Sequence, residues 1–204
     1  MTKIGLYVDG FNMYHAIAAL KKPHLKWLDL WSLAEKLAGE GEEVVRVVYC
    51  SATRTDDVPK MLKHRAYLKA LEARGVDCRL GHFVDADADC RECGRQWVAP
   101  TEKQSDVALA LAVIDDAYKK LVDKVYLLTA DSDQVATISL YRKSFPDQHI
   151  ISVAPPGQNH HAKLRDFANG YKSIKPADLE LCLLPALAGP AAAPVKRPAD
   201  YTPP

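Results

Sequence analysis

Apolar and β-branched residues gather into five short runs, each with the length of a β-strand. Between these runs lie longer stretches in which apolar residues recur at helical spacing. The pattern predicts strands at residues 3–8, 44–50, 77–84, 124–129 and 149–153, and helices at 13–21, 29–38, 59–73, 103–120, 133–143 and 160–169. Strands that alternate with helices are typical of an α/β fold, in which a mainly parallel sheet is covered by helices on both faces.

The pattern changes near residue 185. The remaining sequence, PALAGPAAAPVKRPADYTPP, is rich in Pro and Ala and has no apolar periodicity. We therefore predict one folded domain over residues 1–184, followed by a disordered tail over residues 185–204.

Composition narrows the class of protein. A chain of 204 residues, 48% of them hydrophobic, can bury the core of a single domain. No window approaches the roughly 18 apolar residues of a membrane span, and the opening MTKIGLYVDG lacks the apolar stretch of a signal peptide, so we expect a cytoplasmic protein with no membrane partner. Five cysteines, an odd number, argue against a disulfide framework. Because the net charge is only +1, a nucleic acid would have to be bound by local groups.

Acidic residues directly follow two of the predicted strands. The first strand ends in Asp9, with Gly10 and Asn12 in the turn that enters a helix, and the fourth is followed by Asp131 and Asp133. Ligands of parallel sheets bind beyond the carboxyl ends of the strands. If the first and fourth strands are neighbours, these carboxylates converge on one site.

A fourth acid lies on the buried face of a predicted helix. Asp106 falls on the same helical stripe as the apolar residues Leu109, Val113 and Ala117, so it is expected to face the sheet. Four neighbouring carboxylates repel one another strongly, and a shared Mg²⁺ or Mn²⁺ ion would explain all four positions. The alternative is helix capping, in which Asp131 and Asp133 stabilise a helix start by about 1–2 kcal/mol without any metal.

Three ordered motifs and a helical segment carry a family resemblance. YVDGFNMYHA, EKQSDVALALAV and LLTADSDQVATI, together with RAYLKALEARG, resemble the NYN domain, in the LabA-like branch of the PIN-like nucleases. The resemblance covers residues 1 to about 185 and implies a three-layer α/β/α sandwich with a metal-dependent ribonuclease activity. By matching motif positions it implies an acidic, metal-binding and catalytic set, two polar supports and one phosphate contact: Asp9, Asp106, Asp131 and Asp133, then Asn12 and Ser132, then Lys103.

The chain departs from the family pattern at one position. Many relatives have a second Asp six residues after the helix acid, where this chain has Ala112, with Asp115 and Asp116 a turn further on. Two functions follow. The first is an endoribonuclease that uses Mg²⁺ or Mn²⁺ to activate a water for phosphodiester hydrolysis. The second is a regulatory module that binds RNA or protein and cuts little, which Ala112 and the weak net charge favour. The basic residues are dispersed, and no aromatic stacking motif for single-stranded RNA is evident.

A second candidate metal site lies in the loop DADADCRECGRQW, residues 85–97. Cys90 and Cys93, followed by Gly94, have the spacing of half a zinc knuckle. The missing ligands could come from His82 and another residue of the chain, or from the same cysteines of a second subunit, which would make the chain a homodimer. The alternative is a loop that has lost its metal.

Overall fold

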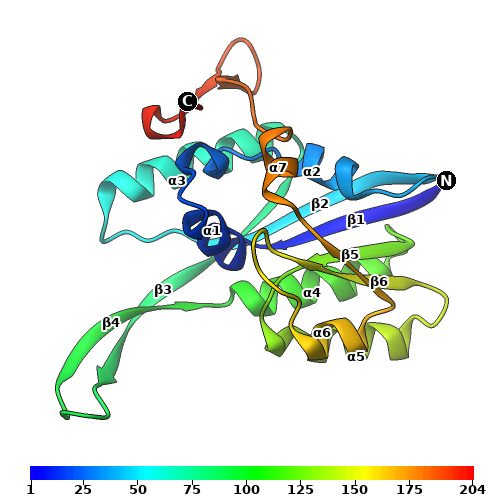
Figure 1. The fold of residues 1–204 in the computed structure, drawn as a ribbon, viewed down its shortest axis with the longest axis horizontal. Helices are drawn as coiled ribbons and strands as arrows, with labels where there is room; N and C mark the ends of the chain where they lie inside the picture. Colours follow the sequence, from blue (N-terminus) through cyan, green and yellow to red (C-terminus); the bar gives the residue numbers. More distant parts are fainter.

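The computed structural model describes all residues from 1 to 204. Its centre is a seven-stranded sheet with the order β4-β3-β2-β1-β5-β6-β7, in which every neighbouring pair is parallel except β3 and β4 (Figure 1). The strands are β1 Thr2–Asp9, β2 Glu42–Ala52, β3 Asp77–Asp89, β4 Gln96–Lys103, β5 Lys124–Leu128, β6 His149–Ala154 and β7 Gly170–Ser173. The prediction of a mainly parallel sheet is confirmed.

Helices cover both faces of this sheet (Figure 1). They are α1 Gly10–Ala19, α2 Leu30–Leu37, α3 Val58–Ala73, α4 Ser105–Tyr118, α5 Val135–Ser144, α6 Ala162–Phe167 and α7 Pro176–Glu180, with short 3₁₀ turns η1 Pro23–Lys26, η2 Ser132–Gln134 and η3 Ala199–Tyr201. None of the helices has the length and hydrophobicity needed to cross a membrane.

Alternation along β1 explains the three layers. Ile4, Leu6 and Val8 belong to a core shared with α1, α2, α3 and α7, whereas Tyr7 belongs to a second core under α4, α5 and α6. Successive side chains of a strand point to opposite faces, so a central strand with helices on both sides must be apolar at nearly every position. The predicted α/β/α sandwich is confirmed.

The antiparallel pair β3 and β4 forms an arm that projects from the body of the molecule (Figure 1). The apolar pattern predicts a strand that ends at residue 84 and a loop over residues 85–97, whereas β3 continues to Asp89. The segment DADAD alternates polar and small apolar residues with the period of a strand, so its acids lie on one face of the ribbon and its alanines on the other. A search for apolar runs overlooks this segment because three of its five residues are charged.

The C-terminal segment, residues 185–204, is ordered rather than a disordered tail. It contains a short hairpin, β8 Leu187–Ala188 and β9 Val195–Lys196, followed by η3, and it lies near α3 (Figure 1). Its anchors do not follow an apolar periodicity. The indole of Trp27 donates to the carbonyl of Pro185 at 2.9 Å, Arg197 donates to the carbonyl of Leu184 at 2.8 Å, and Ala188 is buried in the core shared with α3.

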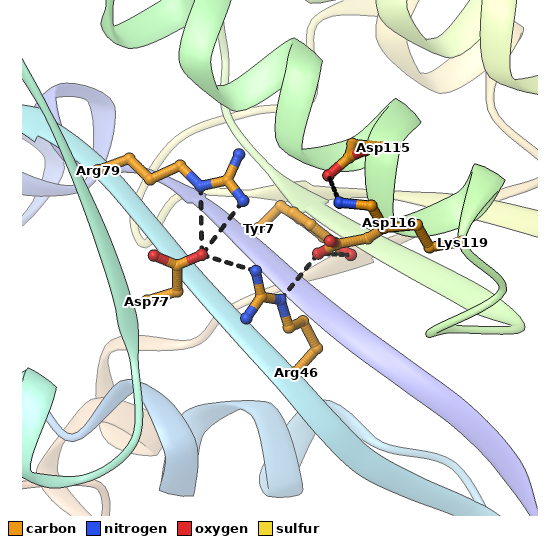
Figure 2. Close-up of polar contacts among 7 residues, drawn as sticks. All are labelled: Tyr7, Arg46, Asp77, Arg79, Asp115, Asp116 and Lys119. Carbon is orange, nitrogen blue, oxygen red and sulfur yellow. Dashed lines mark hydrogen bonds and ion pairs between the residues drawn. The ribbon is translucent and has the colours of Figure 1, made fainter.

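A buried charge network ties α4 to the sheet (Figure 2). The carboxylate of Asp116 accepts hydrogen bonds from the Tyr7 hydroxyl at 2.9 Å and from Arg46 Nε at 2.8 Å. Arg46 also pairs with Asp77 at 2.6 Å, and Asp77 accepts from Arg79 at 3.2 Å. Burial, followed by the charge of Asp116, raises the pKa of Tyr7 well above its usual range. Asp116 therefore joins α4 to β1 and β2.

Replacing Asp116 by Ala should destabilise the protein. The change leaves the Nε of Arg46 and the buried Tyr7 hydroxyl without an acceptor, although Arg46 keeps its pair with Asp77. We expect a loss of about 2–4 kcal/mol in the free energy of unfolding, measured by urea denaturation. Asp115→Ala is the matched control, because Asp115 lies next to it but forms only an exposed pair with Lys119, worth at most about 1 kcal/mol. Equal losses in the two variants would contradict the structural role of Asp116.

Candidate active site

Asp9 is the buried centre of the candidate site. It ends β1 and caps α1, where its carboxylate accepts from the Asn12 backbone amide at 3.0 Å and also from the Asn12 side-chain amide. The Thr129 hydroxyl donates to the same carboxylate at 2.8 Å. Burial raises the pKa of Asp9, and these hydrogen bonds act in the opposite direction. The Asp9 carboxylate is therefore held by residues that follow two different strands, Asn12 after β1 and Thr129 after β5.

Asn12 and Thr129 join the ends of β1 and β5. These strands are parallel neighbours with Val8 aligned to Leu128, as the sequence analysis required. The side-chain oxygen Oδ1 of Asn12 accepts from the backbone amide of Ala130 at 3.1 Å, and the Thr129 hydroxyl accepts from the backbone amide of Asp131 at 3.0 Å. Asn12 is thus a structural support for both loops. Thr129 performs the same task, although the sequence analysis gave it no role.

Asp131 and Asp133 lie in the loop that follows β5. Asp131 caps η2, and its Oδ1 accepts from the backbone amide of Asp133 at 2.9 Å. The capping explanation is therefore correct for Asp131, but it uses only this one of its carboxylate oxygens. Ser132 and Asp133 are exposed. The loop thus presents carboxylates to solvent beside the buried Asp9.

Asp106 in the first turn of α4 completes the acidic group. Burial raises its pKa to about 6, and the charges of Asp9, Asp131, Glu102 and Asp133 act in the same direction. The buried Gln134 joins the two segments, because its side-chain amide donates to the carbonyl of Asp106 at 3.1 Å. The four predicted acids therefore lie in one electrostatic neighbourhood. Glu102, which the sequence analysis missed, is a fifth.

The carboxylates are neighbours rather than a closed metal cage. No three side chains of His, Cys, Asp or Glu are grouped closely enough to hold a metal ion together. Mg²⁺ commonly binds through one or two protein carboxylates and completes its shell with waters and substrate phosphates. The donor set consists of carboxylate oxygens, the type that Mg²⁺ and Mn²⁺ prefer. These residues fit an open site for such an ion.

The start of α4 is held in an unusual conformation. Gln104 has a left-handed φ of 82°, which is uncommon for a residue with a side chain. Gly81 of β3 lies so close that an added Cβ would stand 2.2 Å from the carbonyl oxygen of Lys103. Lys103 itself is exposed at the end of β4, three residues before Asp106. The arm and the helix that carries Asp106 are therefore joined tightly.

The cysteine pair lies at the tip of the arm, away from this site. Gly94 has a φ of 69° and closes the turn by donating to the carbonyl of Cys90 at 2.8 Å. The backbone amides of Cys93 and then Glu92 bond to the Cys90 thiol and lower its pKa. His82 is opposite Lys103 at the base of the arm, eight residues from Cys90, about 26 Å along a strand. The expectation that His82 completes a zinc site with Cys90 in one chain is wrong.

A groove lies next to the acids, and we call it the aromatic groove. It has a volume of about 420 Å³ and is bounded by α1, the end of β2, the start of α3, β3 and η3. Gly10 and Phe11, which directly follow Asp9, form part of its wall. Its aromatic residues are Phe11, Tyr14, Tyr49, Tyr67, Phe83 and Tyr201. The sequence analysis found no such feature, because its rings come from separate segments, one of them the presumed tail.

The sequence of this chain matches a known domain family. The sequence pattern of the NYN domain family matches residues 3–174, which is most of the chain. The chain belongs to the NYN domain family. This confirms the resemblance and gives the molecule the fold of a PIN-like nuclease. Assignment of this NYN domain to the LabA-like branch stays a prediction.

Two individual proteins resemble this NYN domain. A protein of Pseudomonas putida named 6-hydroxy-3-succinoylpyridine 3-monooxygenase HspA is 26% identical over 220 aligned residues, covering 88% of this chain and 69% of the relative. The crystal structure of VPA0982 from Vibrio parahaemolyticus, a protein of unknown function, has a TM-score of 0.57 and 21% identity, covering 90% of this chain and 96% of that one. The second likeness supports the α/β fold alone.

Asp106→Asn should stabilise the metal-free NYN domain near neutral pH. A carboxyl group whose pKa rises from 3.8 to about 6 on folding binds more protons in the folded state, so stability falls as pH rises between these values. Because Asn has no charge to lose, the variant should be more stable at pH 7 by about 1 kcal/mol, or roughly 2–4 °C in Tm, with the difference gone near pH 4.

Thermal melts in EDTA at several pH values test this expectation. Asp115→Asn on the same helix is the control, because its carboxylate lies in an exposed pair with Lys119. A lower Tm for Asp106→Asn at pH 7 would mean that Asp106 stabilises the helix start as a capping residue.

Proposed function

We propose that this NYN domain is an endoribonuclease that hydrolyses RNA with the help of Mg²⁺ or Mn²⁺. The observation that carries the proposal is the environment of Asp106, whose pKa is raised to about 6 by burial and by four other carboxylates. Such an arrangement is unfavourable for folding, and a bound divalent cation offsets the repulsion. A nuclease fold with acids at the ends of its parallel strands is suited to this chemistry.

The available carboxylate oxygens define how the ion would be held. Asp131 keeps its Oδ2 free because only Oδ1 accepts from Asp133. Asp106 and Asp133 would supply the remaining direct or water-mediated contacts, and the hydrogen-bonded Asp9 would contribute charge from the buried side. When bound, the ion activates the attacking water and neutralises the charge that develops on the phosphate.

The other predicted residues would position the RNA and the loops. Lys103 is exposed three residues before Asp106 and would contact a phosphate beside the scissile bond. Asn12 maintains the distance between the two loops through its bonds to Asp9 and Ala130. Ser132, exposed between the two loop acids, would donate to a phosphate oxygen. The RNA substrate is expected to be cytoplasmic.

Two other functions have a specific observation behind them. Ala112, where many family members have an acid, is buried in the core under α4, which favours the regulatory module that binds RNA or protein without cutting. The relative named as a monooxygenase, together with the aromatic groove, favours monooxygenation of a small aromatic acid, a reaction that would take O2 as the oxidant and a reduced cofactor as the source of two electrons.

Metal-dependent cleavage of end-labelled RNA tests the ribonuclease. We expect products with Mg²⁺ or Mn²⁺ and none with EDTA, because the acids alone cannot neutralise the charge on the phosphate. Asp131→Asn should reduce the rate at least 100-fold, on the order of the loss of one electrostatic catalytic group. Asp115→Asn, which changes an exposed acid of α4, should retain full activity, and the loss in Asp131→Asn purified in the same way excludes a contaminating nuclease. Equal cleavage by the two variants would contradict the proposed site.

We also propose that the tip of the arm binds structural zinc between two copies of the chain. Cys90 and Cys93 supply two of the four ligands such a site needs, and the same pair of a partner supplies the others. The turn is already formed in the single chain, and the hydrogen bonds that backbone amides donate to the Cys90 sulfur favour its thiolate form.

Native mass spectrometry checks this zinc site. A dimer with one zinc is expected, and Cys93→Ser should lose both the metal and the dimer, because half of the ligand set is removed. Cys78→Ser is the control, since Cys78 lies opposite Tyr49 of β2 in the body of the sheet, far from the tip of the arm. A zinc-free monomer of the unaltered protein would contradict the zinc proposal. RNA cleavage should not depend on this result, because the tip of the arm lies away from the acids.

A further inference from the structure

The aromatic groove has a chemical character of its own. Basic side chains surround its rings, and no acidic side chain lines it. Within the groove Lys26 lies 4.4 Å from the ring centre of Tyr14, Arg54 lies 5.9 Å from Phe83, and Lys63 lies 6.0 Å from Tyr201. Rings with adjacent cations suit a ligand that is both planar and anionic.

The cations are held loosely enough to accept a ligand. Arg54 pairs with Asp56, Lys60 with Asp57 and Lys63 with Asp200, and each pair has at least one well-exposed member. Exposed ion pairs contribute about 0–1 kcal/mol, so a phosphate can replace these partners at little cost. Lys26 bonds only to the Tyr14 hydroxyl at 3.4 Å. The groove therefore has unused capacity for anionic groups.

One wall can also recognise a base edge. The Nδ1 of His64 forms a hydrogen bond with the Thr53 hydroxyl oxygen at 3.1 Å, and burial lowers the pKa of His64. A neutral imidazole offers its second nitrogen for a hydrogen bond, and Ser51 lines the same groove. The volume of about 420 Å³ lies within the roughly 300–1,000 Å³ of small-ligand sites.

The position of the groove identifies its ligand. Phe11 lines it only two residues after Asp9, and its ring meets that of Phe83 edge to face at 5.9 Å. A polymer whose phosphate reaches the acids can therefore place a neighbouring nucleotide against these rings. We infer that the aromatic groove binds the nucleotide next to the scissile phosphate of single-stranded RNA, with its base on the aromatic side chains and its phosphates on the cations. This rests on the proposed function.

Binding without cleavage tests the groove separately from the nuclease. The probe is a fluorescent single-stranded RNA octamer, and every protein carries Asp131→Asn so that the RNA stays intact. Tyr14→Ala should weaken binding roughly 5- to 150-fold, the effect of losing one base stack. Tyr118→Ala on α4 is the matched control, because Tyr118 is an exposed tyrosine that does not line the groove, and it should change binding less than about 2-fold.

An abasic substitution scanned along the RNA locates the stacked nucleotide. At one position it should weaken binding as Tyr14→Ala does, and it should cause no further loss in the Tyr14→Ala protein. Lys60→Ala should lower the salt dependence of binding by about 0.7 in the log–log slope, whereas Lys119→Ala on α4 should not. Thermal melts confirm that each variant is folded.

Two outcomes would overturn the inference. One is an abasic scan without a sensitive position, together with equal binding by Tyr14→Ala and Tyr118→Ala. The other is Tyr14-dependent binding of 6-hydroxy-3-succinoylpyridine in the groove while RNA binding is independent of Tyr14. Failure of the wild-type protein to cleave RNA is a different result, because groove binding is measured on protein that does not cut.

Discussion

The parallel pairing of β1 and β5 is the constraint on which the candidate site depends. It aligns the end of β1 with the end of β5, so the turn into α1 and the loop into η2 emerge side by side. Asp9, Asn12 and Thr129 then connect these segments through hydrogen bonds between residues that are more than one hundred positions apart in sequence. Asp131 lies near Asp9 only because this alignment holds.

The two ends of α4 each carry a buried or partly buried carboxylate, but only one of them is paired with a cation. Asp116 near its end is buried with Arg46 and Tyr7, so its charge is compensated within the protein. Asp106 at its start is surrounded by other acids. Compensation stabilises a fold, whereas uncompensated charge costs stability and persists where a ligand makes use of it. The difference separates a structural carboxylate from the one that we propose to be functional on the same helix.

Sequence patterns predicted the features that depend on local periodicity. The central strands, the three layers and the acids after β1 and β5 follow from apolar runs and the residues that end them. Pairing across the chain was not predictable in this way. Phe11, Phe83 and Tyr201 form one groove only after folding, and the charges of DADAD masked its alternation. The C-terminal segment is held by single contacts, such as the hydrogen bond from Trp27 to the carbonyl of Pro185.

The conformation of Gln104 has a mechanical consequence. β4 ends at Lys103 and α4 begins at Ser105, so this one left-handed residue is the whole connection between the arm and the helix that carries Asp106. With Gly81 packed against the carbonyl of Lys103, the connection has little slack. A different orientation of the arm would therefore require a different backbone conformation at Gln104 and would displace the first turn of α4, which carries Asp106.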